Sequence, residues 1–243
     1  MLNNKAVRYT LIAILSAVFV FSSVMLIKTV SDSKKTDEQF DELAELVSLP
    51  EDNTSSEAPA TSESGSTVQK PATPTLQPIT RNIALLHERN SDCVGWVYIA
   101  GTRVNYPVMY TPDKPEKYLK RDFYGRIMGS GVPFIDARCN LDSTNIIIYG
   151  HNMKNLSMFG GLRKYLDKSY LKAHPTIEFE TLDGCVKYDI IDVRKTDIKD
   201  DWYTHNLDGN QDGKEYLTLS TCYGLNKNAR LLVIAVKQTE TQE

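Results

Sequence analysis

The chain has 243 residues, of which 41% are hydrophobic, 24% charged and 9% aromatic, and its formal net charge at pH 7 is −3. This composition is typical of a globular protein and excludes a chain that is disordered as a whole. Positive and negative side chains nearly cancel over residues 79–243, so this part offers no excess positive charge to a nucleic-acid backbone. We therefore expect no nucleic-acid partner.

An uncharged apolar stretch lies near the N-terminus. Residues 9–27 contain no charged side chain, and a helix needs about 20 such residues to cross a bilayer. The apolar core of a cleaved signal peptide is shorter, at about 7 to 15 residues, and ends in a site of small residues. We therefore predict an uncleaved transmembrane signal anchor at 9–27, with a cytoplasmic leader at residues 1–8 that carries Lys5 and Arg8. The remainder of the chain is then extracytoplasmic, although Lys28 competes with the leader for the cytoplasmic side.

The segment that follows, residues 28–78, divides into two parts. Residues 32–47 place apolar side chains at helical spacing among acidic ones, which suggests an amphipathic juxtamembrane helix, although a solvated stalk is the favoured interpretation of this segment. The apolar side chains are Phe40, Leu43, Leu46 and Val47. Residues 50–78 consist mainly of Ser, Thr, Pro, Glu and Ala, a composition that buries too little apolar surface to offset the chain entropy. We expect a flexible linker there.

Residues 79–243 contain the predicted folded domain. A helix is expected between residues 79 and 90, and a second helical passage over residues 158–171. Short apolar or alternating runs, separated by turn residues, predict strands over residues 94–99, 104–108, 145–149, 176–180, 186–192, 216–220 and 231–236. Strands at this density, without regular alternation with helices, favour a mainly β fold built as an antiparallel or mixed barrel.

Two of these strands end in residues with reactive side chains. The strand at 145–149 leads through Gly150 to His151, and the strand at 216–220 leads through Thr221 to Cys222. A side chain that stands where a rigid strand gives way to a loop is held in place and stays accessible. His151 and Cys222 at the two strand ends are therefore a candidate pair of functional residues.

Together with Arg230, this pair has the residue types of a nucleophilic active site. A Cys222 thiolate is a good nucleophile, and a nearby His151 can lower the thiol pKa or protonate a leaving amine. Arg230 directly precedes the last predicted strand, where its fixed cationic donors could stabilise an oxyanion. On these residues alone, an inert buried cysteine and a structural histidine are at least equally compatible with the sequence.

Short motifs around these residues resemble those of class B sortases. They are, in chain order, Asp-Cys-Val-Gly-Trp at 92–96, Tyr-Pro-Val at 106–108, Tyr-Gly-His-Asn-Met at 149–153, Ser-Met-Phe-Gly at 157–160, Thr-Leu-Ser-Thr-Cys at 218–222, and Arg230. The resemblance spans residues 79–236. It implies an eight-stranded sortase-type β-barrel at residues 79–243, with an N-terminal helix and one or two short helices, preceded by the transmembrane helix and the linker.

The resemblance also implies an activity. Class B sortases are extracytoplasmic cysteine transpeptidases that cut the C-terminal sorting signal of a surface protein after Thr and join the Thr carboxyl group to a peptidoglycan amine of the cell wall. Carried over to this chain, Cys222 forms the thioacyl intermediate, His151 is the acid and base, and Arg230 holds the carbonyl or its oxyanion. The implied partners are surface proteins with a sorting signal, the peptidoglycan amine and the membrane. No metal or organic cofactor is required.

Substrate contacts follow from the same resemblance. The family grips an extended peptide with the strand ends beside the cysteine and with the loop before it, which makes Ser220, Thr221 and Leu119 the predicted substrate-binding residues. The alternative has equal weight: the two hydroxyls satisfy backbone groups at the strand end, and Leu119 belongs to the core.

The segment before the cysteine strand departs from the family. Class B sortases usually carry a long helical insertion there, whereas residues 194–215 are polar and show no sustained helical period. Within it, Asp208, Asn210 and Asp212 match the first half of a calcium loop. The twelfth position of such a loop is Leu219 instead of Glu, so an ordinary turn is the favoured interpretation and calcium the alternative.

Two other functions are kept as alternatives. One is a pilin-polymerising sortase with a pilin lysine as acceptor, which usually has a lid before the barrel and a second membrane helix after it; neither is evident here. The other is a non-catalytic membrane-tethered peptide-binding module, in which Cys222 resists alkylation. Cys93, Cys139 and Cys185 are expected to be small buried residues, and their disulfide pairing is left open.

Overall fold

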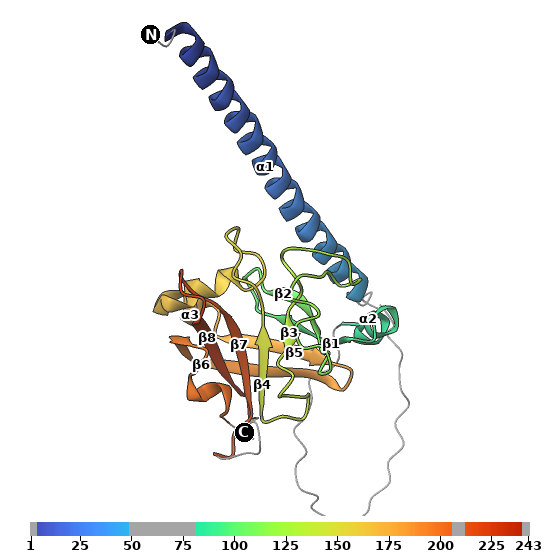
Figure 1. Ribbon diagram of the computed structural model, residues 1–243. Helices are drawn as coiled ribbons and strands as arrows, with labels where there is room; N and C mark the ends of the chain where they lie inside the picture. Colours follow the sequence, from blue (N-terminus) through green and yellow to red (C-terminus); the bar gives the residue numbers. More distant parts are fainter. Residues whose placement is uncertain (1–3, 49–80, 206–211, 240–243) are drawn as a thin grey trace, which may run out of the picture. The chain divides into compact units, whose positions relative to one another are not determined.

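A computed structural model describes residues 4–48, 81–205 and 212–239 (Figure 1). The chain divides into two compact units, Met1–Glu42 and Leu43–Glu243. The predicted linker at 50–78 lies outside the described residues.

The N-terminal helix α1 (Asn4–Val47) contains the predicted membrane span. Its segment Val7–Ile27 is long and apolar enough to cross a membrane, and its apolar side chains are not buried in the protein. The separately expected helix at 32–47 is the continuation of α1, because no Pro or Gly interrupts the helix between the two segments. The last turn of α1 belongs to the second unit, where Leu43 and Val47 are buried.

Eight strands of the described residues form a closed barrel in the second unit, which confirms the predicted fold class. They are β1 (Cys93–Tyr98), β2 (Asn105–Met109), β3 (Phe134–Ile135), β4 (Asn145–Tyr149), β5 (Thr176–Thr181), β6 (Gly184–Asp197), β7 (Tyr216–Cys222) and β8 (Ala229–Lys237). Their order around the barrel is β1-β2-β3-β4-β7-β8-β6-β5, and β5 pairs back with β1. The pairs β2–β3 and β4–β7 are parallel and the others antiparallel.

The helical segments of the barrel unit are short. Helix α2 (Ile83–Arg89) begins at Asn82, whose side chain accepts a hydrogen bond from the Leu85 N–H. The single helical passage expected at 158–171 is instead a 3-10 helix, η1 (Gly160–Leu166), followed by α3 (Lys168–Ala173). The break lies at Asp167, which caps α3 by accepting from the Ser169 N–H. Another 3-10 helix, η2 (Asp201–Tyr203), precedes β7.

Strands β4, β7 and β8 lie side by side and read as nearly continuous apolar runs because the barrel and its loops cover both of their faces. Their fully buried side chains include Ile147, Ile148, Leu217, Leu219 and the run Leu231–Ala235. The register pairs Tyr149 with Ser220 across β4–β7, and Cys222 with Arg230 across β7–β8. These pairings bring three distant parts of the sequence to one end of the barrel.

Candidate active site

The three predicted catalytic residues line one cavity at this end of the barrel. Cys222 is the last residue of β7, His151 follows β4 after Gly150, and Arg230 lies near the start of β8. The cavity has a volume of about 610 Å³ and is lined by all three side chains. The strand ends therefore place a thiol, an imidazole and a guanidinium around a space that a peptide can enter.

Cys222 differs from the other cysteines in its accessibility. All four cysteines are free thiols, but Cys93, Cys139 and Cys185 are buried, whereas Cys222 is exposed. Burial raises the pKa of Cys93 to about 12 and the pKa values of Cys139 and Cys185 to about 11. The three buried thiols are therefore protonated and inert near neutral pH, and Cys222 is the accessible thiol among the four.

His151 is oriented by a backbone carbonyl. Its Nε2 lies 2.7 Å from the carbonyl oxygen of Leu119, a distance at which Nε2–H donates to that oxygen. A neutral imidazole that donates from Nε2 has its free lone pair on Nδ1. The hydrogen bond to the Leu119 carbonyl thus makes Nε2 a donor and leaves Nδ1 available for proton transfer.

Arg230 is held by carbonyl groups at the start of its own strand. Its Nη1 donates to the carbonyl oxygens of Lys227 and Ala229, at 2.7 and 3.0 Å. The strand register sets Arg230 opposite Cys222. A guanidinium fixed beside the nucleophile can offer its remaining N–H groups to a developing oxyanion.

The chain on both sides of His151 packs so closely that two positions require glycine. A Cβ atom at Gly150 would lie 2.6 Å from the ring of Phe159, and one at Gly160 would lie 2.2 Å from the Met153 carbonyl oxygen. The Phe159 N–H donates to the His151 carbonyl at 3.0 Å and closes the loop behind the histidine. His151 is therefore carried by a tight loop.

Two residues of this loop, Leu156 and Met158, adopt left-handed backbone conformations, with φ of 67° and 49°. Each costs about 1 kcal/mol or more in a residue with a branched or long side chain. Neighbouring contacts hold the conformation: the Met158 N–H donates to the Tyr106 hydroxyl, and Arg103 donates to the Asn155 carbonyl. Strain of this kind next to a reactive histidine is typical of a functional site.

The three predicted substrate-binding residues all line the cavity. Ser220 and Thr221 are buried, and their hydroxyls have partners in the protein: the Ser220 Oγ lies 2.7 Å from the Tyr203 hydroxyl, and the Thr221 Oγ1 donates to the Gly150 carbonyl at 2.7 Å. Leu119 contributes its side chain to the cavity wall and its carbonyl to His151. The three residues thus have structural contacts, and their contact with substrate stays a prediction.

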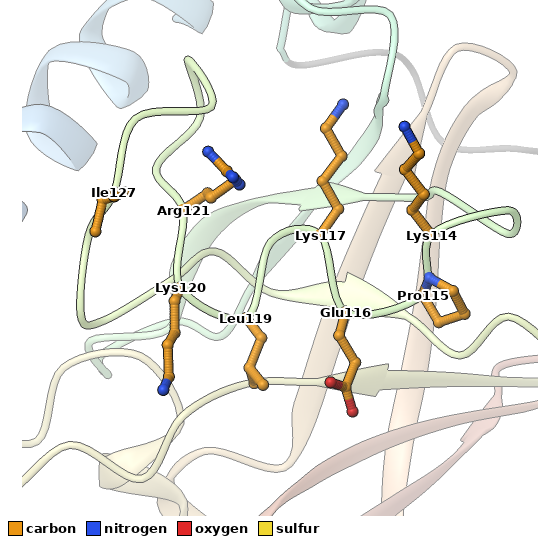
Figure 2. A pocket seen from close by; sticks show the side chains of 8 residues that line it. All are labelled: Lys114, Pro115, Glu116, Lys117, Leu119, Lys120, Arg121 and Ile127. Carbon is orange, nitrogen blue, oxygen red and sulfur yellow. The ribbon is translucent and has the colours of Figure 1, made fainter.

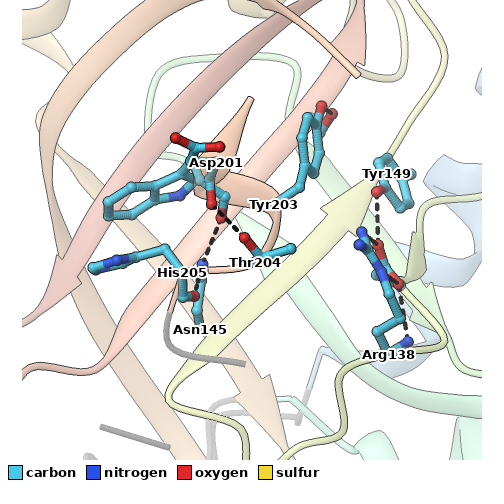
Figure 3. A network of polar contacts seen from close by, with 10 residues as sticks. Arg138, Asn145, Tyr149, Asp201, Tyr203, Thr204 and His205 are labelled. Carbon is cyan, nitrogen blue, oxygen red and sulfur yellow. Dashed lines mark hydrogen bonds and ion pairs between the residues drawn. The ribbon is translucent and has the colours of Figure 1, made fainter. Parts of the chain in front are cut away.

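A polar cluster around the buried Asp136, which the sequence analysis missed, forms another wall of the cavity (Figure 3). Asp136 accepts hydrogen bonds from the Tyr149 hydroxyl at 2.7 Å and from Arg138 Nη2 at 2.6 Å. Burial raises the pKa of Asp136, but these hydrogen bonds outweigh it and hold the pKa below the usual 3.8. The motif Tyr-Gly-His contained one member of the cluster, but no sequence pattern marks the partners of Tyr149.

A second polar network lies at the other end of β4 and secures the segment before β7 (Figure 3). The fully buried Asn145 donates from Nδ2 to the His205 carbonyl at 2.9 Å and accepts from the Thr218 hydroxyl at 3.0 Å. The Trp202 indole in turn donates to Thr218 at 2.8 Å. This network fixes η2 and, with it, Tyr203 of the cavity wall.

Next to the catalytic cavity lies a more open hollow of about 900 Å³ (Figure 2). It shares Pro115, Glu116 and Leu119 with the cavity. Figure 2 shows Glu116 and Leu119 extending from the same side of the loop. The loop that orients His151 through Leu119 therefore also separates two surface depressions.

The calcium alternative falls partly outside the described residues, because these exclude Asp208 and Asn210. Asp212 accepts hydrogen bonds from the Tyr216 hydroxyl and the Lys214 N–H. Within the ranges that the structure describes, no group of three His, Cys, Asp or Glu side chains is placed to hold a metal ion. Calcium binding stays a hypothesis for this loop.

Comparison with known proteins identifies relatives of this fold and site. The family model for the sortase domain matches residues 97–238. Sortase B of Listeria monocytogenes is 41% identical over 107 residues, which are 43% of this chain and 42% of that protein. Sortase B of Staphylococcus aureus is 33% identical over 134 residues, 54% of each chain. The matches thus span about half the length of these curated relatives.

A solved structure of a sortase B is also similar to this chain. The Staphylococcus aureus sortase B–substrate complex superposes with a TM-score of 0.57 at 28% sequence identity, covering 65% of this chain and 85% of that chain. The barrel and the arrangement of its strands are therefore similar to those of a protein solved with a substrate.

Proposed function

Because the chain belongs to the sortase family, and within it to class B, we propose that it is a membrane-anchored cysteine transpeptidase that attaches surface proteins to the cell wall. It cleaves a C-terminal sorting signal after Thr and transfers the Thr carboxyl group to a peptidoglycan amine. The observation that carries this proposal is the cavity in which Cys222, His151 and Arg230 meet on three neighbouring strand ends. The substrate complex of the Staphylococcus aureus relative supports a peptide substrate.

In the first half-reaction, the Cys222 thiolate attacks the carbonyl carbon of Thr. The C–O π electrons move to the oxygen, and the Arg230 guanidinium stabilises the resulting oxyanion. The tetrahedral intermediate collapses when the C–N bond breaks, and His151 gives a proton to the departing amine. The products are a thioester on Cys222 and the released C-terminal segment.

In the second half-reaction, the acceptor amine attacks the thioester. His151 takes the proton that the amine loses, the new C–N bond forms, and the thiolate of Cys222 leaves. Water can take the place of the amine, which yields hydrolysis. Two easier steps thereby replace one difficult amide exchange.

The proposed membrane anchor at residues 9–27 brings enzyme and substrates together. The helical segment Val7–Ile27 supports it by length and composition. With residues 1–8 in the cytoplasm and the barrel outside the membrane, the enzyme, its membrane-bound substrate and a lipid-linked acceptor occupy one plane. Confinement to a plane raises their effective concentration.

Peptide cleavage by the 243-residue chain in detergent tests the proposal. We expect a library of fluorescent peptides shaped like sorting signals to contain sequences that are cleaved by the wild type and left intact by Cys222→Ala. Amines that contain glycine or diaminopimelate should divert the thioester from hydrolysis to transfer. Preferential transfer to a lysine side chain of a pilin-like peptide would instead favour pilin polymerisation.

Thiol titration separates the enzyme from a binding module. In the native chain near neutral pH, one thiol, Cys222, should react rapidly with a thiol reagent, and all four should react after denaturation, because the other three are buried. Loss of the fast phase in Cys222→Ala is the control. A native chain whose Cys222 resists the reagent, and which cleaves no peptide, would favour the membrane-tethered peptide-binding module.

The reaction requires no metal or organic cofactor, because nucleophile, acid/base and cation are all side chains. Cleavage should therefore be unchanged by a chelator. A loss that millimolar calcium restores would favour the calcium loop at Asp208, Asn210 and Asp212, and an absence of binding heat with calcium would exclude it.

A further inference from the structure

The seam between β4 and β7 continues beyond the backbone ladder through side chains. At the end of the ladder, the Gly150 N–H donates to the Ser220 carbonyl at 3.1 Å. One residue further along β7, the Thr221 hydroxyl donates to the Gly150 carbonyl at 2.7 Å. The next connection is made by Asn152, whose Nδ2 donates to the Cys222 carbonyl at 2.8 Å. Among the hydrogen bonds between the described parts of these two segments, the one from the Asn152 amide reaches Cys222.

This contact completes the fixation of the peptide group that follows the nucleophile. Its carbonyl, on Cys222, is held by Asn152, and its N–H, on Tyr223, donates to the Ala229 carbonyl at 3.0 Å. A peptide group held on both edges has little freedom to rotate about the Cys222 Cα–C bond. These two contacts therefore hold the backbone that carries the thiol.

Asn152 is itself well fixed. It forms an isolated antiparallel bridge with Met158, and the neighbouring His151 carbonyl accepts from the Phe159 N–H. Asn152 also directly follows His151 in the chain. A displacement of the acid/base loop is thereby transmitted through Asn152 to the peptide group of Cys222.

We propose that Asn152 is a positioning residue that couples the thiol of Cys222 to the imidazole of His151 by holding the Cys222 carbonyl. The proposal rests on the cysteine transpeptidase function proposed above. Asn152 acts through the backbone and contacts no reacting atom. Its role is to keep the distance between nucleophile and acid/base constant while the substrate binds.

Steady-state cleavage of a sorting peptide by the 243-residue chain tests this role. Asn152→Ala and Asn152→Asp should lower kcat by about 10- to 100-fold, because small misplacements of reacting groups cost rates of this order. Asn152→Asp tests the hydrogen-bond donor specifically, because Asp has the shape of Asn but no N–H donor at neutral pH. KM for the peptide should change by less than about twofold. Asn152→Gln keeps the donor and should restore part of the rate.

Two controls isolate the geometric effect. Lys154→Ala shortens an exposed side chain of the same loop and should leave kcat unchanged. Alkylation of Cys222 by iodoacetamide at a pH where the thiol is fully ionised needs no alignment with His151, so its rate in the Asn152 variants should stay within about twofold of the wild type. Wild-type kcat in Asn152→Asp, or a loss confined to KM, would overturn the proposal.

A measurement without substrate keeps this inference separate from the proposed function. Release of the Cys222 carbonyl should speed hydrogen exchange at the Tyr223 amide by about fivefold in Asn152→Asp, in line with the loss of one hydrogen bond. Unchanged exchange would overturn the positioning role, whatever the activity. Absence of cleavage by the wild type, by contrast, would contradict the transpeptidase function and leave the exchange result to decide the role of Asn152.

Discussion

Removal of the Asn145 side chain should destabilise the barrel far more than removal of an exposed asparagine. Asn145 is fully buried, and its amide joins β4 to Thr218 of β7 and to His205 beyond η2. Asn145→Ala loses two hydrogen bonds of about 1 kcal/mol net each, and the buried Thr218 hydroxyl left without its acceptor costs about 1 kcal/mol more. We therefore expect the free energy of unfolding to fall by about 3 kcal/mol.

Urea unfolding followed by circular dichroism measures this change. At roughly 2–4 °C per kcal/mol, the corresponding fall in Tm is roughly 6–12 °C. Asn228→Ala is the matched control, because this asparagine is exposed, and its effect should stay within about 0.5 kcal/mol. Asn145→Ala should also raise KM for the sorting peptide, since the Asn145 network holds Tyr203 in the cavity wall.

A double-mutant cycle with Thr218→Val identifies the cause. If the Asn145–Thr218 hydrogen bond carries the effect, the two substitutions together should cost at least about 1 kcal/mol less than the sum of the single ones. Additive losses would show that the network does not act as a unit. An Asn145→Ala variant as stable as the wild type would refute the reasoning from burial altogether.

Three further outcomes are expected. The pKa of Asp136 in the folded protein lies below the usual 3.8, so its contribution to stability is complete above pH 3.8 and is lost as the pH falls through the folded pKa. The loss of unfolding free energy that urea titration measures for Asp136→Asn at pH 7 should therefore be smaller at about pH 3. Arg230→Lys keeps the charge but loses the fork of donors, so kcat for peptide cleavage should fall about 10²-fold with little loss of fold; wild-type kcat would contradict its oxyanion role. Gly160→Ala should lower stability by about 1–3 kcal/mol because its Cβ would lie 2.2 Å from the Met153 carbonyl. Gly161→Ala, where the nearest atom is 3.5 Å away, should be neutral, and equal losses in both would contradict the packing argument.

Hydrophobic pattern predicted most of the barrel because its strands are bounded by turn residues. The strand at 145–149 agrees with β4 residue for residue. β3 was missed because two residues, Phe134 and Ile135, carry no periodicity. β6 continues to Asp197, beyond the predicted 192, because pairing with β8 stabilises charged residues that have no strand pattern of their own.

The candidate site could be predicted from the sequence only for those residues that lie in short motifs. Cys222, His151 and Arg230 were found in the sequence, and the strand register explains why they lie together. Asn152 stood inside a recognised motif, yet its bond to a carbonyl 70 residues away is set by tertiary packing alone. The polar clusters around Asp136 and Asn145 likewise depend on partners from other strands, which no local pattern specifies.

The candidate active site is completed late in the folding of this chain. The seam of β4 and β7 joins residues 71 positions apart, so closing it orders a long intervening segment at a considerable loss of chain entropy. Arg230 comes from β8, which follows β7 in the chain and therefore leaves the ribosome after it. A nascent chain that has exposed Cys222 still lacks the cation beside it and the closed barrel around it. Under the proposed function, bond cleavage therefore requires the finished barrel, and a nascent chain that ends before β8 exposes the Cys222 thiol without the arginine expected to act with it.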